Sequence, residues 1–165
     1  TVGAGIKAGL QSAGITRKDL FVTAKLWPGN PAWGDAPKTK AQTLDECDAS
    51  LARLGLDYVD LYLIHAPYGG DMRLEQWRAL LELQANGKAR SIGVSNFNES
   101  HLNEIKAAGL PMPDANQIEL HPWSQKQICW PIWINTPSHR LPTAASCHSQ
   151  LGAQKKAKPA PKPTK

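Results

Sequence analysis

The sequence predicts an α/β fold with a parallel sheet, because strand-like apolar runs alternate along the chain with segments of helical periodicity. The runs expected to form strands are residues 20–27, 58–64, 91–94 and 115–118, and helices are expected at 39–54, 72–86 and 99–108. Repeated strand–helix–strand units are right-handed and bring their strands together in parallel. A barrel fragment and a doubly wound open sheet both fit this order of elements.

The first expected helix carries signals along its length and at both ends. Its apolar residues recur at helical spacing and are Leu44, Cys47, Leu51 and Leu54. Thr39 and Gln42 fit a capping box at its amino end, and Gly55 fits a carboxyl-terminal stop. The strand before it ends at a Pro-Gly-Asn turn, which separates the two elements.

The two later helices show the same kinds of signal. The apolar face of the helix at 72–86 consists of Leu74, Trp77, Leu80 and Leu81, and Gly87 follows as its stop. Asn98 fits an amino-terminal cap for the helix at 99–108, which is followed by Gly109. The strands between these helices are short and rich in apolar residues, as expected of strands buried on both faces.

Charge and composition exclude several classes of protein. The chain has 165 residues and a net charge of +5, but residues 1–150 carry equal numbers of basic and acidic side chains. The excess lies in a tail whose lysines are Lys155, Lys156, Lys158, Lys162 and Lys165. We therefore expect no nucleic-acid binding by the body of the chain, since phosphate contacts need clustered basic residues. A tail that binds nucleic acid or an acidic membrane surface is the weaker alternative to a solvated tail.

Other sequence features favour a cytoplasmic protein. No apolar run is long enough to cross a membrane, and no signal peptide is visible at the start of the sequence. Cys47, Cys129 and Cys147 are widely spaced and form no CxxC pair, so neither a metal site nor a disulfide framework is indicated. These observations fit a reducing compartment.

Polar side chains stand at the carboxyl end of every predicted strand. They are Lys25, His65, Ser95 with Asn96, and Gln117. In parallel α/β folds the carboxyl ends of the strands bind ligands, so these groups are expected to converge on one rim. Taken singly, each has a simpler explanation: a solvated charge, a histidine bonded to the backbone, a helix-capping turn or a buried amide. Together the four strand ends favour a binding or catalytic site.

Four stretches of the chain are distinctive, namely DLFVTAKLW, LGLDYVDLYLIHAP, GKARSIGVSNFN and NQIELHPW. Each resembles the corresponding stretch of aldo-keto reductases, and they follow one another in the order that the family has them. The resemblance covers residues 1–126 and implies strands three to six of a (β/α)8 TIM barrel, with their helices. A complete barrel of this kind needs roughly 250 residues. Residues 127–150 match nothing in the family and are expected to be irregular, and the Lys/Pro/Ala tail at 151–165 is expected to be disordered.

The resemblance implies a carbonyl reductase that uses NADPH to reduce an aldehyde or ketone to an alcohol. Lys25 matches the active-site lysine, whose charge lowers the pKa of a catalytic tyrosine. His65 matches the histidine that orients the substrate carbonyl, and Trp27 matches an aromatic wall of the substrate pocket. Ser95, Asn96 and Gln117 match residues that hydrogen-bond the nicotinamide carboxamide. Amide side chains suit that role because they both donate and accept hydrogen bonds.

The sequence also departs from the family pattern. Residues 1–24 contain no tyrosine, so the catalytic tyrosine and its partner aspartate have no counterpart upstream of Lys25. Tyr68, near His65, is a weak candidate for a substitute acid. The chain is therefore expected to be truncated and impaired, and the alternative is a non-catalytic module that binds the cofactor or a partner. Open barrel edges also predict self-association.

Overall fold

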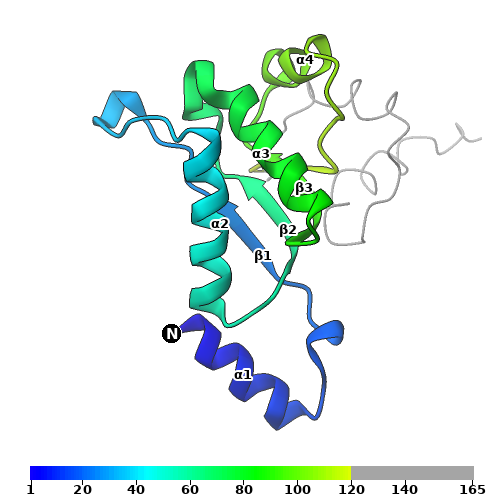
Figure 1. The fold of residues 1–165 in the computed structure, drawn as a ribbon. Coiled ribbons are helices and arrows are strands. Elements are labelled where there is room, and N and C mark those ends of the chain that lie inside the picture. Colours follow the sequence, from blue (N-terminus) through cyan, green and yellow to red (C-terminus); the bar gives the residue numbers. More distant parts are fainter. Residues whose placement is uncertain (120–165) are drawn as a thin grey trace, which may run out of the picture.

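A four-stranded parallel sheet forms the centre of the computed structural model, which describes residues 1–119 (Figure 1). Its strands are β1 Thr23–Leu26, β2 Val59–Ile64, β3 Ala89–Ser95 and β4 Ala115–Gln117. They lie in sequence order, and each pairs in parallel with the next. The prediction of a parallel sheet is confirmed.

The helices decide between the two folds that the sequence left open. Three of them connect successive strands, namely α2 Lys40–Leu54, α3 Arg73–Ala85 and α4 Glu99–Ala107. Side chains of all three pack into a single cluster with one face of the sheet, and Figure 1 shows α2 and α3 side by side across it. A doubly wound sheet reverses its strand order and carries helices on both faces, whereas a (β/α)8 barrel does neither. The arrangement is that of a barrel fragment.

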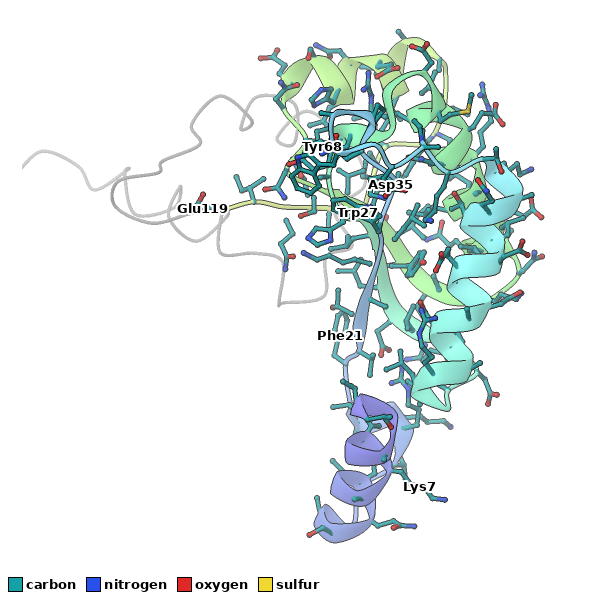
Figure 2. The ribbon with its side chains drawn as sticks, turned by 90° about the vertical axis from the view of Figure 1, so that its left-hand side faces the viewer. Lys7, Phe21, Trp27, Asp35, Tyr68 and Glu119 are labelled. Carbon is teal, nitrogen blue, oxygen red and sulfur yellow. The ribbon has the colours of Figure 1, made fainter. Side chains whose placement is uncertain are left out.

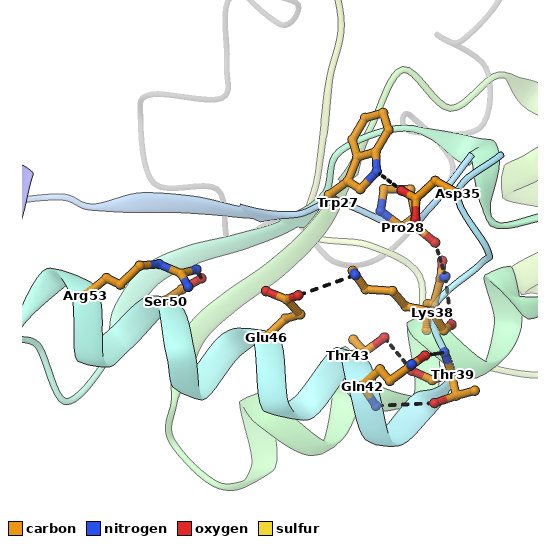
Figure 3. A network of polar contacts seen from close by, with 11 residues as sticks. Trp27, Pro28, Asp35, Lys38, Thr39, Gln42, Thr43, Glu46, Ser50 and Arg53 are labelled. Carbon is orange, nitrogen blue, oxygen red and sulfur yellow. Dashed lines mark hydrogen bonds and ion pairs between the residues drawn. The ribbon is translucent and has the colours of Figure 1, made fainter. Parts of the chain in front are cut away.

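The expected helix boundaries agree with the structure to within one residue. Thr39 Oγ1 accepts from the Gln42 amide at 3.3 Å, and Gln42 Oε1 accepts from the Thr39 amide at 2.9 Å, which completes the predicted capping box (Figure 3). Gly55 ends α2 in the left-handed conformation with φ of 67°. The sequence did not predict three short 3-10 segments, at Arg17–Asp19, Pro31–Trp33 and Pro67–Met72.

A fourth helix, α1 Val2–Ala13, precedes the sheet and was not predicted from the sequence. Thr1 caps it by accepting a hydrogen bond from the Ala4 amide at 3.3 Å. Its glycines disfavour a helix when they are considered alone. Gly3 nevertheless has a packing role, because a Cβ there would lie 2.6 Å from the backbone oxygens of Arg53 and Leu54. The close approach of α1 to the end of α2 thus needs a residue without a side chain.

The core between helices and sheet holds the predicted apolar faces. Trp77 and Leu80 of α3 are fully buried, as is Cys47 of α2, and Leu51 is nearly so. Trp77 also donates its indole N–H to the Pro111 carbonyl at 2.9 Å, so its one polar atom is satisfied. Because these side chains are buried and closely packed, the strands are held rigidly, and the positions of their carboxyl ends are fixed.

Charged side chains at the amino ends of β1, β2 and β3 form a network around a buried carboxylate. The Asp60 carboxylate, 6% exposed, accepts from Arg17 at 2.7 Å and from Arg90 at 3.3 Å. It also accepts from the Val22 backbone amide at 2.8 Å. Both guanidinium groups lie 4.2 Å from the centroid of the Tyr58 ring. This network, which we call the amino-end clamp, joins the segment before β1 to β2 and β3.

Two sequence predictions concern residues that the structure does not describe, namely the irregular segment at 127–150 and the tail at 151–165. In the part of the chain that is described, no helix has the length and apolar character needed to span a membrane.

Candidate active site

The register of the sheet places one predicted site residue from each strand in a single row. Leu26 pairs with Ile64 and Ile64 with Val94, so the residues that follow them, Trp27, His65 and Ser95, are neighbours. Ser95 in turn pairs with Gln117. The row lies at the carboxyl ends of the strands, and we call it the rim. The structure therefore brings together the residues that the sequence singled out.

Lys25 lies two residues before Trp27, on the same face of β1. In the sheet its neighbours across the strands are, in turn, Leu63, Gly93 and Ala115. A Cβ at position 93 would stand 2.4 Å from the Ala115 backbone oxygen and 2.8 Å from Leu63 Cδ2. The floor below the rim thus consists of small and apolar residues, with Lys25 as its one charged member.

Lys25 and His65 interact electrostatically. The pKa of His65 lies below its ordinary value of 6.5, first because of partial burial and second because of the positive charge of Lys25. The imidazole is therefore neutral at neutral pH, with one N–H to donate and one nitrogen to accept. Among residues 1–119 Lys25 forms no ion pair, so its charge is available to a ligand at the rim.

Hydrogen bonds order the side of the rim formed by β3 and β4. The Ser95 hydroxyl donates to the Gln117 carbonyl at 3.0 Å, and the Asn96 backbone amide donates to the same oxygen at 2.9 Å. The Asn96 side-chain amide donates to Ser95 Oγ at 3.2 Å and to the His65 carbonyl at 3.3 Å. Asn96 thus connects the β3–β4 side of the rim to the histidine on β2.

Asn96 also has an unusual backbone. Its φ of 60° is the one positive φ of a non-glycine residue in the described part of the chain. Asparagine tolerates this left-handed conformation better than most residues. Such outliers concentrate at ligand-binding sites, where the surrounding structure holds them. Here the hydrogen bonds to the Gln117 and His65 carbonyls supply that restraint.

An aromatic cluster adjoins the rim at the β1 and β2 ends, and the sequence had indicated only part of it. Trp27 meets the His65 ring edge-on, with centroids 5.8 Å apart. Trp33 stacks on Trp27 at 5.7 Å with an interplanar angle of 15°, and Tyr68 lies 6.0 Å from both indoles. Figure 2 shows Trp27 and Tyr68 close together beside Asp35. No periodicity or spacing in the sequence could have identified the stacking of Trp33.

The loop that carries Trp33 is held firmly. Asp35 accepts the Trp27 indole N–H at 2.5 Å, which ties the middle of the loop to the rim (Figure 3). Gln76 of α3, fully buried, donates its side-chain amide to the carbonyls of Pro28 at 2.9 Å and Lys38 at 3.0 Å. The Lys38 amide donates to the Pro28 carbonyl at 2.9 Å. The loop from 28 to 38 is therefore closed at its neck.

The rim has the donors and acceptors that a nicotinamide carboxamide needs. Asn96 and Gln117 are exposed. Asn96 offers its amide oxygen, since its two amide hydrogens already donate to Ser95 Oγ and the His65 carbonyl, and Gln117 offers both an amide N–H2 and an amide oxygen. Within residues 1–119 the Gln117 side chain takes part in no hydrogen bond. The chemistry of these residues thus fits an amide-bearing ring bound at the β3–β4 side, next to His65 and Lys25.

A comparison with protein families shows which family the chain belongs to. The model described as "Aldo/keto reductase family" matches residues 1–133. The chain belongs to the aldo/keto reductase family. The match extends past residue 126, where the resemblance had been expected to stop.

Curated relatives within the aldo/keto reductases share more than two fifths of the matched residues. The uncharacterized oxidoreductase YtbE of Bacillus subtilis is 44% identical over 128 residues, which are 77% of this chain and 43% of that protein. Glyoxal reductase of the same organism is 42% identical over 75% of this chain and 42% of its own length. Morphine 6-dehydrogenase of Pseudomonas putida is 43% identical over 73% of this chain and 39% of its own length. The chain thus spans less than half the length of these relatives.

Solved structures of aldo/keto reductases have the same fold. The enzyme from Brucella melitensis superposes with a TM-score of 0.64 at 43% identity, over 75% of this chain and 46% of that one. A Bombyx mori aldo-keto reductase in complex with NADP gives a TM-score of 0.66 at 36% identity, over 78% and 42% of the two chains. The four strands described above therefore form part of an aldo/keto reductase barrel.

Proposed function

We propose that the rim binds NADPH and a carbonyl substrate, in the reduction of an aldehyde or ketone to an alcohol. The observation that carries this proposal is the row of one site residue from each strand, with Lys25 acting on His65 from below. Aldehyde and ketone reductions build negative charge on the carbonyl oxygen, and a nearby cation with hydrogen-bond donors stabilises it. The relatives include a glyoxal reductase and an enzyme solved with NADP, which supports the same reaction class.

His65 and Lys25 have different roles in the proposed reaction. The neutral imidazole of His65 donates its N–H to the substrate oxygen and thereby fixes the direction of the carbonyl. The Lys25 ammonium lies deeper and favours the charge that develops on that oxygen. A bound reduced nicotinamide would supply the hydride for the carbonyl carbon, and solvent water, which reaches the exposed His65, would supply the proton that completes the alcohol.

Ser95, Asn96 and Gln117 are assigned to the carboxamide of the cofactor. When the cofactor is bound, the amides of Asn96 and Gln117 would hydrogen-bond its carboxamide, and the buried Ser95 hydroxyl would hold the Asn96 side chain and the Gln117 carbonyl in place for this contact. Because Asn96 also bonds the His65 carbonyl, the cofactor side and the substrate side of the rim share one residue. Trp27 forms the wall against which the substrate rests, at the edge of the His65 ring.

The proposal includes the setting in which the chain works. We assign it to the cytoplasm and to small-molecule carbonyl substrates. The outer edges of β1 and β4 have no partner strand within residues 1–119, so self-association through these edges is expected.

The test measures NADPH binding by fluorescence and NADPH consumption with 4-nitrobenzaldehyde. Lys25→Met and His65→Ala are expected to lower turnover by about a hundredfold or more. Lys7→Met is the matched control, since Lys7 lies on α1 at the opposite end of the molecule (Figure 2). Asn96→Gly keeps the left-handed backbone but removes the amide, so it is expected to weaken NADPH binding by about tenfold.

Two results would count against the proposal. A folded chain that fails to bind NADPH contradicts the assignment of the rim to the cofactor. Binding without turnover would make the chain a cofactor-binding module and overturn the assignment of reductase activity to it.

A further inference from the structure

Trp33 presents an aromatic surface to solvent in an unusual way. It is 71% exposed although it stacks on Trp27, and Tyr68 beside it is 42% exposed. One face of the Trp33 indole is thus covered by Trp27, and much of the remainder is open. Large aromatic side chains that remain this exposed on a rigid site commonly mark a binding surface.

The loop is built to hold Trp33 in this place. Asn30 Oδ1 caps the short 3-10 segment that contains Trp33 by accepting from the Ala32 amide at 3.1 Å. Asn30 and Asp35 also form an antiparallel bridge across the loop. A Cβ at Gly29 would stand 2.2 Å from the Ala36 oxygen, so only glycine fits at this position of the loop. The indole is therefore presented by a preorganised loop, which reduces the entropy lost on binding.

The exposed aromatic rings adjoin His65, the residue proposed to bind the substrate carbonyl. The Trp27 and His65 rings lie in a T-shaped pair, Trp33 stacks on Trp27, and Tyr68 contacts both indoles from the turn after β2. A molecule whose carbonyl oxygen meets His65 therefore has aromatic rings beside it on the side away from the cofactor. An aliphatic group bound there would bury apolar surface, and a planar aromatic ring would in addition gain the stacking energy of aromatic pairs.

We propose that Trp33 and Tyr68 are specificity-determining residues that bind an aromatic ring attached to the substrate carbonyl. The inference rests on the proposed function, because it places the carbonyl at His65. The stacked arrangement also excludes a cation held between the two indoles. Their ring planes are nearly parallel and their centroids are 5.7 Å apart, as in an aromatic pair in direct contact.

The experiment compares two ketones with the same carbon skeleton, acetophenone and cyclohexyl methyl ketone. Their dissociation constants are measured by ligand-observed NMR with the full chain and NADP⁺, which carries no hydride to donate. Wild type is expected to bind acetophenone about three- to tenfold more tightly, the amount that aromatic stacking provides. Trp33→Leu and Tyr68→Leu are expected to reduce this preference to less than twofold, and Trp33→Phe to keep most of it.

Phe21→Leu is the matched control. Phe21 has the same exposed fraction as Tyr68, 42%, but precedes β1 and lies well away from the aromatic cluster (Figure 2). It is expected to leave the preference unchanged. Because Trp33 and Tyr68 are exposed, their replacement is expected to leave the core intact, and circular dichroism of each variant checks that it does.

His65→Ala separates the two proposals. It is expected to weaken both ketones equally, since both carry the carbonyl. Equal affinity of wild type for the two ketones, or a preference that survives Trp33→Leu, overturns the aromatic specificity while carbonyl binding at His65 stands. A third outcome is that Trp33→Leu abolishes the preference while His65→Ala leaves the affinity for both ketones unchanged. It would overturn the assumption that the bound ring belongs to a substrate. Failure to bind either ketone overturns both proposals.

Discussion

The two ends of the sheet differ in whether their charged side chains are paired with one another. At the amino ends, Asp60 is 6% exposed and bonded to two guanidinium groups and a backbone amide. At the carboxyl ends, His65 is exposed and Lys25 has no ion-pair partner among the described residues. The one non-glycine residue with positive φ in that part of the chain, Asn96, also lies there.

This contrast shows where the fold uses polar groups for stability and where it keeps them available. Charges in the amino-end clamp satisfy one another and join three segments of the chain. Those at the rim remain open to a ligand, as the carboxyl ends of barrel strands generally do. Substitutions at the amino ends should therefore affect unfolding, and those at the rim should affect binding and proton equilibria.

The largest effect is expected at the amino-end clamp. Asp60→Ala removes a nearly buried carboxylate and leaves the largely buried Arg17 charge without its anionic partner, which should lower the free energy of unfolding by about 3–5 kcal/mol. Asp48→Ala breaks the exposed pair with Lys88 and should cost less than about 1 kcal/mol. Urea denaturation of the full chain measures both. Equal losses in the two variants would show that the clamp is no stronger than a surface pair.

A pair of glycines tests how tightly the floor below the rim is packed. Gly93→Ala forces a methyl group against the Ala115 oxygen and Leu63, so we expect a loss of about 1–3 kcal/mol. Gly5→Ala, inside α1 with nothing within 4 Å of the added carbon, should instead gain about 0.5–1 kcal/mol. Thermal unfolding gives both signs. A stabilised Gly93→Ala variant would contradict the close approach of β3 and β4.

The smallest effect concerns the protonation of His65. Because Lys25 and partial burial lower its pKa below 6.5, the unfolded state binds a proton more readily than the folded state. The stability that His65 contributes is thus present above pH 6.5 and is lost as the pH falls through the folded-state pKa. Lys25→Met should raise this pKa toward 6.5, as NMR titration of the imidazole protons would show. An unchanged pKa would mean that the lysine charge does not reach the ring.

His101 provides the internal control in the same titration. Its pKa is also lowered, chiefly by burial and then by the charge of Arg73 on α3. Neither cause involves Lys25, so the His101 titration should be the same in wild type and in Lys25→Met. A common shift of both histidines would indicate a general change in the protein.

Local signals in the sequence were enough to predict the later helices but not α1. Thr39 with Gln42 and Gly55 marked both ends of α2, and the structure shows each of those caps. α1 was missed because Gly3, Gly5 and Gly9 lower its helix propensity, while the contact of Gly3 with the end of α2 is tertiary. The order of strands and helices also left two folds open, since only the packing of the helices on a single face distinguishes them.

For the site, strand ends could be predicted but loop geometry could not. Parallel strands bring their carboxyl ends together whatever their sequence, so Lys25, His65 and Gln117 were expected on one rim. The stacking of Trp33 on Trp27 depends on the path of the loop, which Asp35 and Gln76 fix through contacts made only after folding. The left-handed backbone of Asn96 likewise follows from hydrogen bonds to other strands.

The position of Gln76 has a consequence for how this protein can change over evolution. Its side-chain amide holds both ends of the loop from α3, the helix that packs beside α2. The residues between those ends can then vary in length and identity while their points of departure stay fixed, and a longer loop adds little closure entropy. Under the proposed function, exchange of this one segment in a descendant chain would change the substrate range, with the strands and the residues of the rim inherited unchanged.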